Sequence, residues 1–400
     1  MPCEEEGTRM PDMGIVAGPM GQGRPLLPGN ICRRDACARL VRADLIAEGL
    51  SRLEKRLSSV WMRAKSICKL CWKGICLRME NFSASVVLPT CNRNNDLLNS
   101  LKSIYKQTFK NFEVLIVNDG DEQISDFLAR QAGFLEDMDH KILNTKGRSG
   151  PSNARNVGLA RAKGDIVFYL DDDDAYYPEH LQVHMDEYRR SPLLGVVYSD
   201  ANRGKVVYDA EGSPRLDISL QHSHDFDADK LLIQNYIPIL CLSHKKSCLS
   251  LSGLFDPTLS YLEDWDFLIR LSVNYKFRHV KQTTAIYMEK GGGLSLQQVH
   301  NEKFLDNLFD VYQRSEKYLL DDQDRLANIW HMRSRHIGMM ANVTGEYFEG
   351  VGNLELARNA FSNAVKFYPD PAYYVNLARV QKLLGHHLDA LISLQTAKLL

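Results

Sequence analysis

The stretch DIVFYLDDDDAYYPEH, residues 165–180, contains the pattern on which the predicted fold depends. An apolar run of strand length, residues 165–170, leads directly into four consecutive aspartates, residues 171–174. Neighbouring carboxylates repel one another and are costly to desolvate, so these charges cannot be there to stabilise the strand. A helix N-cap, the alternative explanation, would need only one of them. We therefore expect a Mg²⁺ or Mn²⁺ site at the end of a buried strand, because these cations prefer carboxylate oxygens and can bridge to phosphate.

Strand and helix patterns alternate on the N-terminal side of this run. Short apolar or β-branched segments are separated by segments with helical spacing, an order that predicts an α/β fold with a mainly parallel sheet flanked by helices. Ligands of such sheets bind beyond the carboxyl ends of the strands, which is where the polar clusters of this sequence lie. The predicted strands are residues 83–89, 112–120, 141–144 and 165–170, and the predicted helices are residues 97–105, 124–132 and 151–163.

Composition narrows the classes of protein and of partner. The 400 residues are 44% hydrophobic and 25% charged, which is ordinary for a globular protein, and the length favours two or three units. A formal net charge of −1 argues against nucleic acid as a partner. No apolar stretch approaches the ~20 residues that span a bilayer, and the N-terminus lacks a signal-peptide pattern. Nine scattered cysteines fit reduced thiols, so we expect a cytoplasmic protein.

Two segments precede the first predicted strand. Residues 1–38 are rich in Gly, Pro and Met without periodicity, and we expect them to be disordered. Residues 39–80 have the spacing of an amphipathic helix, with ten Lys and Arg against three Asp and Glu in residues 39–78. This basic helix could pack on the next domain or lie on a membrane surface, which would place the protein at the inner face of the membrane.

The C-terminal stretch contains an internal repeat. Residues 338–400 hold two units with a period of 33 positions, and small residues at matching places would let paired helices approach closely. This pattern resembles tetratricopeptide repeats, which bind partner proteins, and it would follow a helical linker at residues 301–337. The matched pairs are Gly345 with Ala378, Gly352 with Gly385, Ala357 with Ala390, Phe361 with Leu394, and Ala364 with Ala397.

Four stretches together are similar to the signatures of one enzyme family. They are VVLPTCNR (86–93), VNDG (117–120), GPSNARNVGLARAKGDIVFYLDDDD (150–174) and LSGLFDPTLSYLEDWDFLIRL (251–271). In this order and spacing they resemble the family 2 glycosyltransferases, whose catalytic domain has the GT-A fold. The resemblance implies a GT-A domain over residues 81–300 that uses a nucleotide-sugar donor, here a UDP-sugar.

The resemblance also implies roles on the donor side of the site. The family's Asp-x-Asp pair falls on Asp171 and Asp173, which implies that Asp171 lies near the ribose and that both take part in the metal site. Asp119 matches the acid that accepts the imide N–H of uracil, although an Asp-Gly turn is the plain alternative. The remaining expected donor-binding residues are Pro89 and Thr90 beside the base, and Arg93, Arg148 and Arg155 as cationic partners of the nucleotide or diphosphate.

On the acceptor side, the family's base falls on Asp264, with Glu263 in support. Inverting transfer needs one carboxylate to take the proton from the acceptor hydroxyl, whereas the alternative for this pair is a solvated helix start. The neighbouring Trp265 could stack on a sugar or pack in the core. Residues 287–295 lack the histidine that the family often places there, which leaves the third metal ligand open. No motif of processive synthases is present, so we expect transfer of single sugars.

Three functions remain open from the sequence. The first is an inverting, metal-dependent, non-processive transferase acting on a hydroxyl of a glycan, a lipid-linked glycan or a protein. The second is an inert transferase-like domain in a protein that binds partners through its repeats. The third is a nucleotidyltransferase, which normally carries a glycine-rich loop after the first strand, whereas TCNRNND (90–96) has no glycine.

Overall fold

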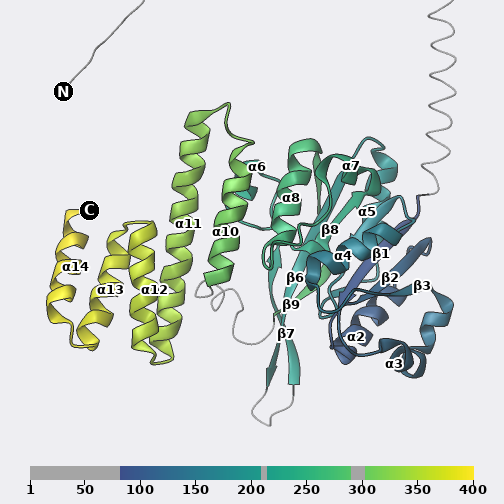
Figure 1. Ribbon diagram of the computed structural model, residues 1–400, viewed down its shortest axis with the longest axis horizontal. Helices are drawn as coiled ribbons and strands as arrows, with labels where there is room; N and C mark the ends of the chain where they lie inside the picture. The colour runs from purple at the N-terminus through teal and green to yellow at the C-terminus, as the bar shows by residue number, and fades with distance from the viewer. Residues whose placement is uncertain (1–81, 209–213, 290–301) are drawn as a thin grey trace, which may run out of the picture. The chain divides into compact units, whose positions relative to one another are not determined.

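A computed structural model describes residues 82–208, 214–289 and 302–400 (Figure 1). The expected disordered segment 1–38 and the expected basic helix 39–80 lie outside these residues. The described chain contains one mixed sheet with helices on both faces, followed by a series of helices. The predicted class, an α/β domain with an all-α C-terminal segment, is confirmed.

The N-terminal half of the sheet is parallel, as predicted. Its strands stand in the order β3-β2-β1-β4 and all three pairings are parallel. These strands are β1 (Ala84–Thr90), β2 (Phe112–Asn118), β3 (Asp139–Asn144) and β4 (Ile166–Tyr169). The connecting helices are α2 (Asn94–Tyr105), α3 (Ile124–Gln131), followed by a 3₁₀ turn at Gly133–Asp137, and α4 (Gly150–Arg161).

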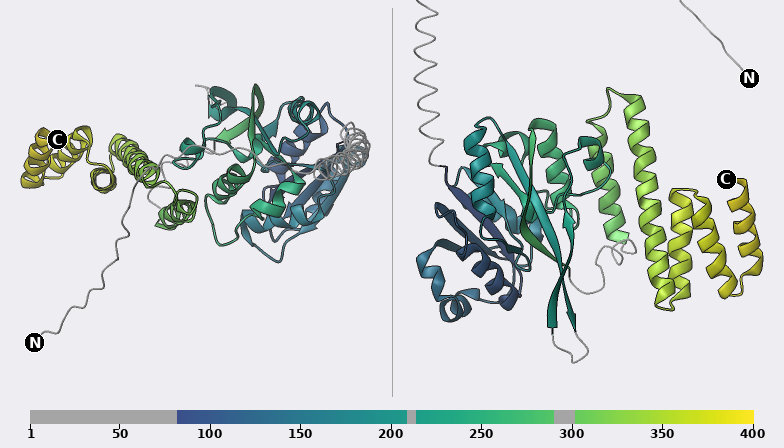
Figure 2. Two further views of the ribbon diagram at one scale, coloured as in Figure 1. Left: turned by 90° about the horizontal axis from the view of Figure 1, so that it is seen from above. Right: turned by 180° about the vertical axis from the view of Figure 1, so that it is seen from behind.

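Beyond β4 the sheet changes direction. The order continues β8-β6-β9-β5, with β8 antiparallel to both β4 and β6, and β9 parallel to β6. The strand β7 pairs with the outer part of β6, and Figure 2 shows this ribbon reaching beyond the rest of the sheet. The strands are β5 (Ala175–Tyr176), β6 (Val196–Tyr208), β7 (Pro214–His222), β8 (Leu242–Lys245) and β9 (Phe277–Glu289). The helices in this part are α5 (His180–Arg190), α6 (Ala228–Leu231), α7 (Leu249–Ser252) and α8 (Glu263–Asn274), with 3₁₀ turns at Ile239–Cys241 and Lys246–Cys248.

Alternation along β1 divides the core between the two faces of the sheet. Val86 and Leu88 point into one apolar cluster with α2, α3 and α5, whereas Val87 points into a second cluster with α4 and α8. Helix α4 lies very close to the sheet, because a Cβ atom at Gly158 would be 2.5 Å from Val87 Cγ1. The absence of a side chain at Gly158 therefore brings the whole of α4, including Arg155, near the ends of β1 and β4.

The C-terminal helices pack against their neighbours in chain order (Figure 1). They are α10 (Glu302–Glu316), α11 (Gln323–Gly350), α12 (Leu354–Phe367), α13 (Pro371–Leu383) and α14 (His387–Leu399). The first two do more than connect. Tyr312 of α10 and Ile329 and Ile337 of α11 belong to the same buried cluster as α4 and α8. The segment expected as a linker thus contributes to the core of the α/β domain.

Close helix packing in this segment yields a stability prediction. A Cβ atom at Gly345 of α11 would lie 2.6 Å from the Phe361 ring of α12, whereas at Gly350 it would meet no described atom within 4 Å. We expect Gly345→Ala to lower the free energy of unfolding by about 1–3 kcal/mol through overpacking. Gly350→Ala, the matched control in the same helix, should raise it by about 0.5–1 kcal/mol because alanine favours the helix. Denaturation followed by circular dichroism checks both, and equal effects of the two substitutions would contradict the packing.

Candidate active site

The four aspartates after β4 divide into two pairs with different surroundings. Asp172 is fully buried, and its Oδ2 accepts a 2.7 Å hydrogen bond from Thr90 Oγ1 at the end of β1. Burial raises the pKa of Asp172 to about 6. Asp174 is 4% exposed, and its Oδ1 accepts from the backbone N–H of Met288 in β9 at 2.8 Å. These two aspartates tie the turn to the sheet, while Asp171 and Asp173 keep partly exposed side chains, 30% and 20%.

Arg93 occupies the loop beside this turn. Its guanidinium contacts Asp172 Oδ1 at 2.6 Å and Asp173 Oδ2 at 3.0 Å, and its side chain is 40% exposed. The guanidinium of Arg93, which was predicted as a cationic partner of the nucleotide or diphosphate, thus lies next to the aspartates. A donor phosphate would share or replace part of this pairing.

Arg155 of α4 connects the aspartate turn to α8. This side chain is 4% exposed; Nη2 lies 2.8 Å from Asp171 Oδ1, and Nη1 lies 2.7 Å from Glu263 Oε1. A buried guanidinium must be paired, since an uncompensated charge in the interior is costly. The two carboxylates meet that need from positions 92 residues apart, and so bring the predicted metal turn next to the predicted acceptor residues.

The acid pair begins helix α8. Leu262, just before it, has φ of 63°, a left-handed backbone that is unusual for leucine. Asp264 Oδ2 accepts from Asn235 Nδ2 at 3.1 Å, and Oδ1 accepts from the Trp265 N–H at 2.7 Å. Burial and the nearby Glu263 carboxylate raise the pKa of Asp264 well above its ordinary range. A carboxylate with a raised pKa binds a proton more readily, which suits a general base.

One cavity joins the two sides. It has a volume of about 330 Å³ and is bordered by Asp171 and Arg155 at one side and by Glu263 and Asp264 at the other. A donor diphosphate and an acceptor hydroxyl could therefore meet in one place. Its full lining is Pro151, Arg155, Asp171, Asp174, Pro238, Ile239, Leu240, Ser260, Tyr261, Leu262, Glu263, Asp264, Tyr287 and Phe304.

The remaining predicted donor residues lie outside this lining. Pro89 and Thr90, the last two residues of β1, are buried. Arg148 is 63% exposed and pairs with Asp121 at 3.1 Å. Asp119 is 7% exposed and accepts hydrogen bonds from the hydroxyl of Thr145, from the N–H and hydroxyl of Ser149 and from the N–H of Gly150.

The position of Asp119 gives it a structural task. Three of its four hydrogen bonds end on Oδ1 and one on Oδ2, so an acceptor position remains on Oδ2 for an incoming N–H. The bonds fix the loop that leads into α4. Asp119 therefore fixes the N-terminal end of α4, the helix that carries Arg155.

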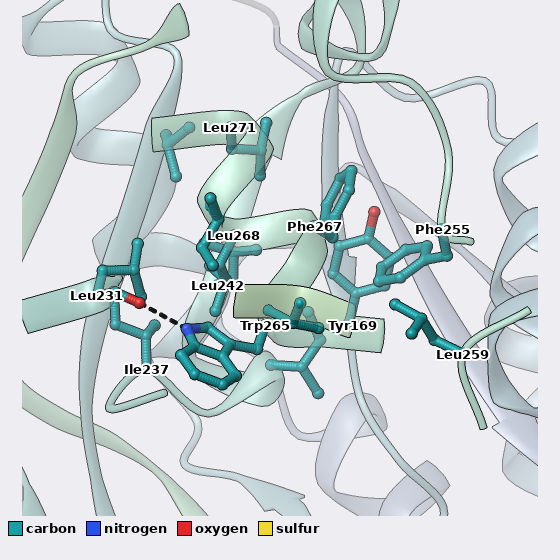
Figure 3. Packing of buried hydrophobic residues seen from close by; sticks show 14 of the residues in the cluster. Tyr169, Leu231, Ile237, Leu242, Phe255, Leu259, Trp265, Phe267, Leu268 and Leu271 are labelled. Atoms are coloured by element: carbon teal, nitrogen blue, oxygen red, sulfur yellow. Dashed lines mark hydrogen bonds between the residues drawn. The ribbon is translucent and has the colours of Figure 1, made fainter. Parts of the chain in front are cut away.

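Trp265 is a core residue. It is 2% exposed, and its Nε1 donates to the Leu231 carbonyl at 2.6 Å (Figure 3). Its indole packs edge-on against Tyr312. Of the two roles open from the sequence, stacking on a sugar is thereby excluded in this arrangement. The indole instead anchors the first turn of α8, and with it the acid pair.

Several residues that shape the site were not found from the sequence. Asn235 holds Asp264, and Tyr261 and Tyr287 line the cavity. Asn156 makes two hydrogen bonds with the backbone of Phe255, at 2.8 and 3.0 Å. Asn156 and Tyr261 lie within quoted signature stretches and Asn235 and Tyr287 do not, but the contacts of all four become visible only when distant segments come together.

The chemistry of the carboxylates fits a hard divalent cation. Asp171 and Asp173 offer oxygen ligands on one turn, as Mg²⁺ or Mn²⁺ requires. Among the described residues, no group of three or more His, Cys, Asp or Glu is arranged to hold a metal ion. A bound diphosphate and water would add oxygen ligands, as is usual for magnesium.

Comparisons with known proteins identify the first domain. Residues 85–247 match the family described as Glycosyl transferase family 2. The chain carries a glycosyl transferase family 2 domain. The matched region contains the aspartate turn and Arg155, and it ends before the acid pair of α8.

Two relatives of this chain are likewise described as glycosyltransferases. The uncharacterized glycosyltransferase YwdF of Bacillus subtilis is 28% identical over 212 residues, which cover 52% of this chain and 75% of the relative. An uncharacterized glycosyltransferase of Haemophilus influenzae is 23% identical over 308 residues, 74% of this chain and 99% of the relative. The prediction that the chain is a glycosyltransferase is confirmed.

Two solved structures also align with most of this chain. S. aureus TarS aligns at 16% identity over 79% of this chain and 54% of that chain, with a TM-score of 0.47. The mannosyltransferase PcManGT from Pyrobaculum calidifontis, in complex with GDP-Man and Mn²⁺, aligns at 16% identity over 82% of this chain and 94% of that chain, with a TM-score of 0.46.

None of the helices in the described part of the chain combines the length and the apolar character that a membrane-spanning helix needs.

The buried bridge yields a prediction about stability and pH. Arg155→Met should lower the free energy of unfolding by about 3 kcal/mol, because Asp171 and Glu263 lose their shared cation. The loss should be larger at pH 8 than at pH 5. Arg155 lowers the pKa of the nearby Asp264, so in the variant this pKa rises further in the folded state, and protonation at lower pH relieves the repulsion among the carboxylates.

The control is Arg148→Met, which removes an exposed ion pair and should change the free energy of unfolding by about 0.5 kcal/mol or less. Urea denaturation at both pH values measures these quantities. Equal losses for the two substitutions would show that the Arg155 bridge does not organise the site.

Proposed function

We propose that this glycosyltransferase moves a single sugar, with inversion, from a UDP-sugar to a hydroxyl of a glycan, a lipid-linked glycan or a protein. The observation that carries this proposal is the single cavity that joins the aspartate turn to Glu263 and Asp264. Inversion requires the acceptor oxygen to attack the anomeric carbon from the side opposite the leaving diphosphate. One cavity with a turn for the diphosphate at one end and a base at the other suits this in-line displacement.

On the acceptor side, Asp264 would take the proton of the attacking hydroxyl. Its raised pKa favours proton acceptance. Asn235 holds one carboxylate oxygen, and the Trp265 N–H holds the other, so the group has a defined orientation. Glu263, paired with Arg155, would support the acceptor and keep the local charge balanced.

On the donor side, Asp171 and Asp173 would hold the divalent cation beneath the diphosphate. When bound, such a cation neutralises the charge that develops on the departing nucleotide. Arg93 and Arg155 lie beside this turn and could exchange a carboxylate partner for a phosphate oxygen. The nucleobase would lie against the ends of β1 and β2, beside Pro89, Thr90 and Asp119. Arg148, in the exposed loop, would reach the nucleotide.

The proposal extends to the rest of the chain. The helices α11 to α14 would act as tetratricopeptide-like repeats that bind a protein partner. Exposed leucines and an isoleucine on α14 support this, since Leu388, Leu391 and Ile392 are 72%, 58% and 53% exposed. We further propose action in the cytoplasm, with contact to the inner face of the membrane through residues 39–80, which lie outside the described residues.

A donor screen tests the reaction. UDP release from one or more UDP-sugars should depend on Mn²⁺ or Mg²⁺ and stop in the presence of a chelator. Asp173→Asn should weaken both cation and donor binding by ~10-fold or more, because it removes a charged oxygen ligand. Asp217→Asn, on the exposed ribbon β7, is the control and should bind normally. A chain that binds no UDP-sugar at any metal concentration would refute the donor assignment.

A second test addresses the assignment of Asp264 as the general base. Asp264→Asn should keep donor affinity and lower kcat by ~10²–10⁴-fold, because the amide cannot accept the hydroxyl proton. Asp266→Asn is the matched control, since Asp266 lies in the same helical turn, pairs with Arg270 and does not line the cavity. In the wild type, activity should rise with pH through a midpoint well above pH ~4, the ordinary value for an aspartate. Unchanged turnover in the Asp264 variant would exclude it as the base.

A further inference from the structure

Helix α10 holds the loop that leads into the acid pair. Asn307 of α10 is 6% exposed, and its Oδ1 accepts two hydrogen bonds, from the N–H groups of Ser260 and Tyr261, both at 3.0 Å. Phe304, one turn earlier, packs edge-on against the Tyr261 ring at 5.9 Å and lines the cavity. The loop before α8 is therefore fixed by a helix from beyond the α/β sheet.

The turn fixed in this way is a demanding one. Directly after the two bonded amides comes Leu262, with φ of 63° and ψ of 19°. A left-handed residue with a side chain costs about 1–2 kcal/mol and persists only where its surroundings impose it. Glu263 and Asp264 follow at once, so the direction of both carboxylates depends on this turn. The two hydrogen bonds to Asn307 restrain the backbone directly before this turn.

A second set of contacts, from α10 and α11, holds the segment just before Asn235, which donates to Asp264. Tyr312 of α10 donates through its hydroxyl to the Ile233 carbonyl at 2.8 Å. Arg333 of α11, fully buried, donates to the Leu232 carbonyl at 2.9 Å. These carbonyls lie two and three residues before Asn235, the partner of Asp264.

We infer that Asn307 is a positioning residue for sugar transfer and that α10 is an integral part of the acceptor side of the site. The inference rests on the proposed function of Asp264. Asn307 acts through the backbone at Ser260 and Tyr261 and touches neither of the carboxylates. The cavity is complete only with α10, which contributes Phe304 to its wall.

The test compares three variants of the full chain. Asn307→Leu removes the accepting oxygen at similar volume, and Asn307→Asp keeps it. Asn353→Leu is the control, since Asn353 Oδ1 likewise accepts a backbone N–H, that of Leu356, at the start of α12 and away from the loop. Should Asn307→Leu fail to fold, Asn307→Ala removes the same oxygen without added bulk.

Two measurements are made on each variant. Hydrogen exchange at the Ser260 and Tyr261 amides reports the loop directly and needs no substrate. Steady-state UDP release from the accepted UDP-sugar gives kcat and the donor KM. We expect Asn307→Leu to speed exchange at both amides and to lower kcat by ~10- to 100-fold with donor KM within about twofold, because misplacing a catalytic group affects the transition state more than donor binding.

Asn307→Asp should restore slow exchange and most of kcat, and Asn353→Leu should leave both unchanged. A kcat of Asn307→Leu equal to that of the wild type, or a fall shared by Asn353→Leu, would overturn the positioning role. A wild-type chain that releases no UDP would overturn the proposed function, and the positioning role with it, whereas the first two results leave the proposed function standing.

Discussion

The site depends on the pairing of one buried guanidinium with two carboxylates. Arg155 lies between Asp171 and Glu263, at 2.8 and 2.7 Å, with almost no exposure to solvent. A buried charge in this position is tolerated only while it remains paired, and the two carboxylates provide that pairing here. The end of β4, the first turn of α8 and the axis of α4 are therefore constrained together. Gly158 contributes by letting α4 lie against Val87 of β1.

Around this bridge, the aspartate run divides its tasks. Asp172 and Asp174 face inward and fix the turn to β1 and β9. Asp171 and Asp173 are left at the surface of the site, where they can serve a cation. The helical segment adds a third set of constraints, because Asn307 and Arg333 hold the two loops that flank Asp264. Under the proposed function, the α/β sheet would provide the donor side and the helices would complete the acceptor side.

The sequence predicted the parallel half of the sheet well, because its strands and helices have strong local periodicity. The strands β6 to β9, which pair in both directions, were not predicted, since their pairing depends on partners tens of residues away. The acid pair was found only through the resemblance to family 2, and the burial of Glu263 was not foreseen. Arg155 was expected as a partner of the nucleotide or diphosphate, yet it bridges Asp171 and Glu263, a contact across 108 residues for the latter. Asn307 carried no signal at all, because a lone asparagine in a helix is unremarkable until the loop it holds is known.

The most direct measurement is a crystal structure of the chain with UDP and Mn²⁺. The account predicts a diphosphate beside Asp171 and Asp173, with Glu263 and Asp264 facing the open side of the same cavity. A second cavity, of about 530 Å³, lies behind α8 and is bordered by Asp256, Arg270 and Arg314. UDP bound in that second cavity, with the aspartate turn still paired only to Arg93 and Arg155, would contradict the account.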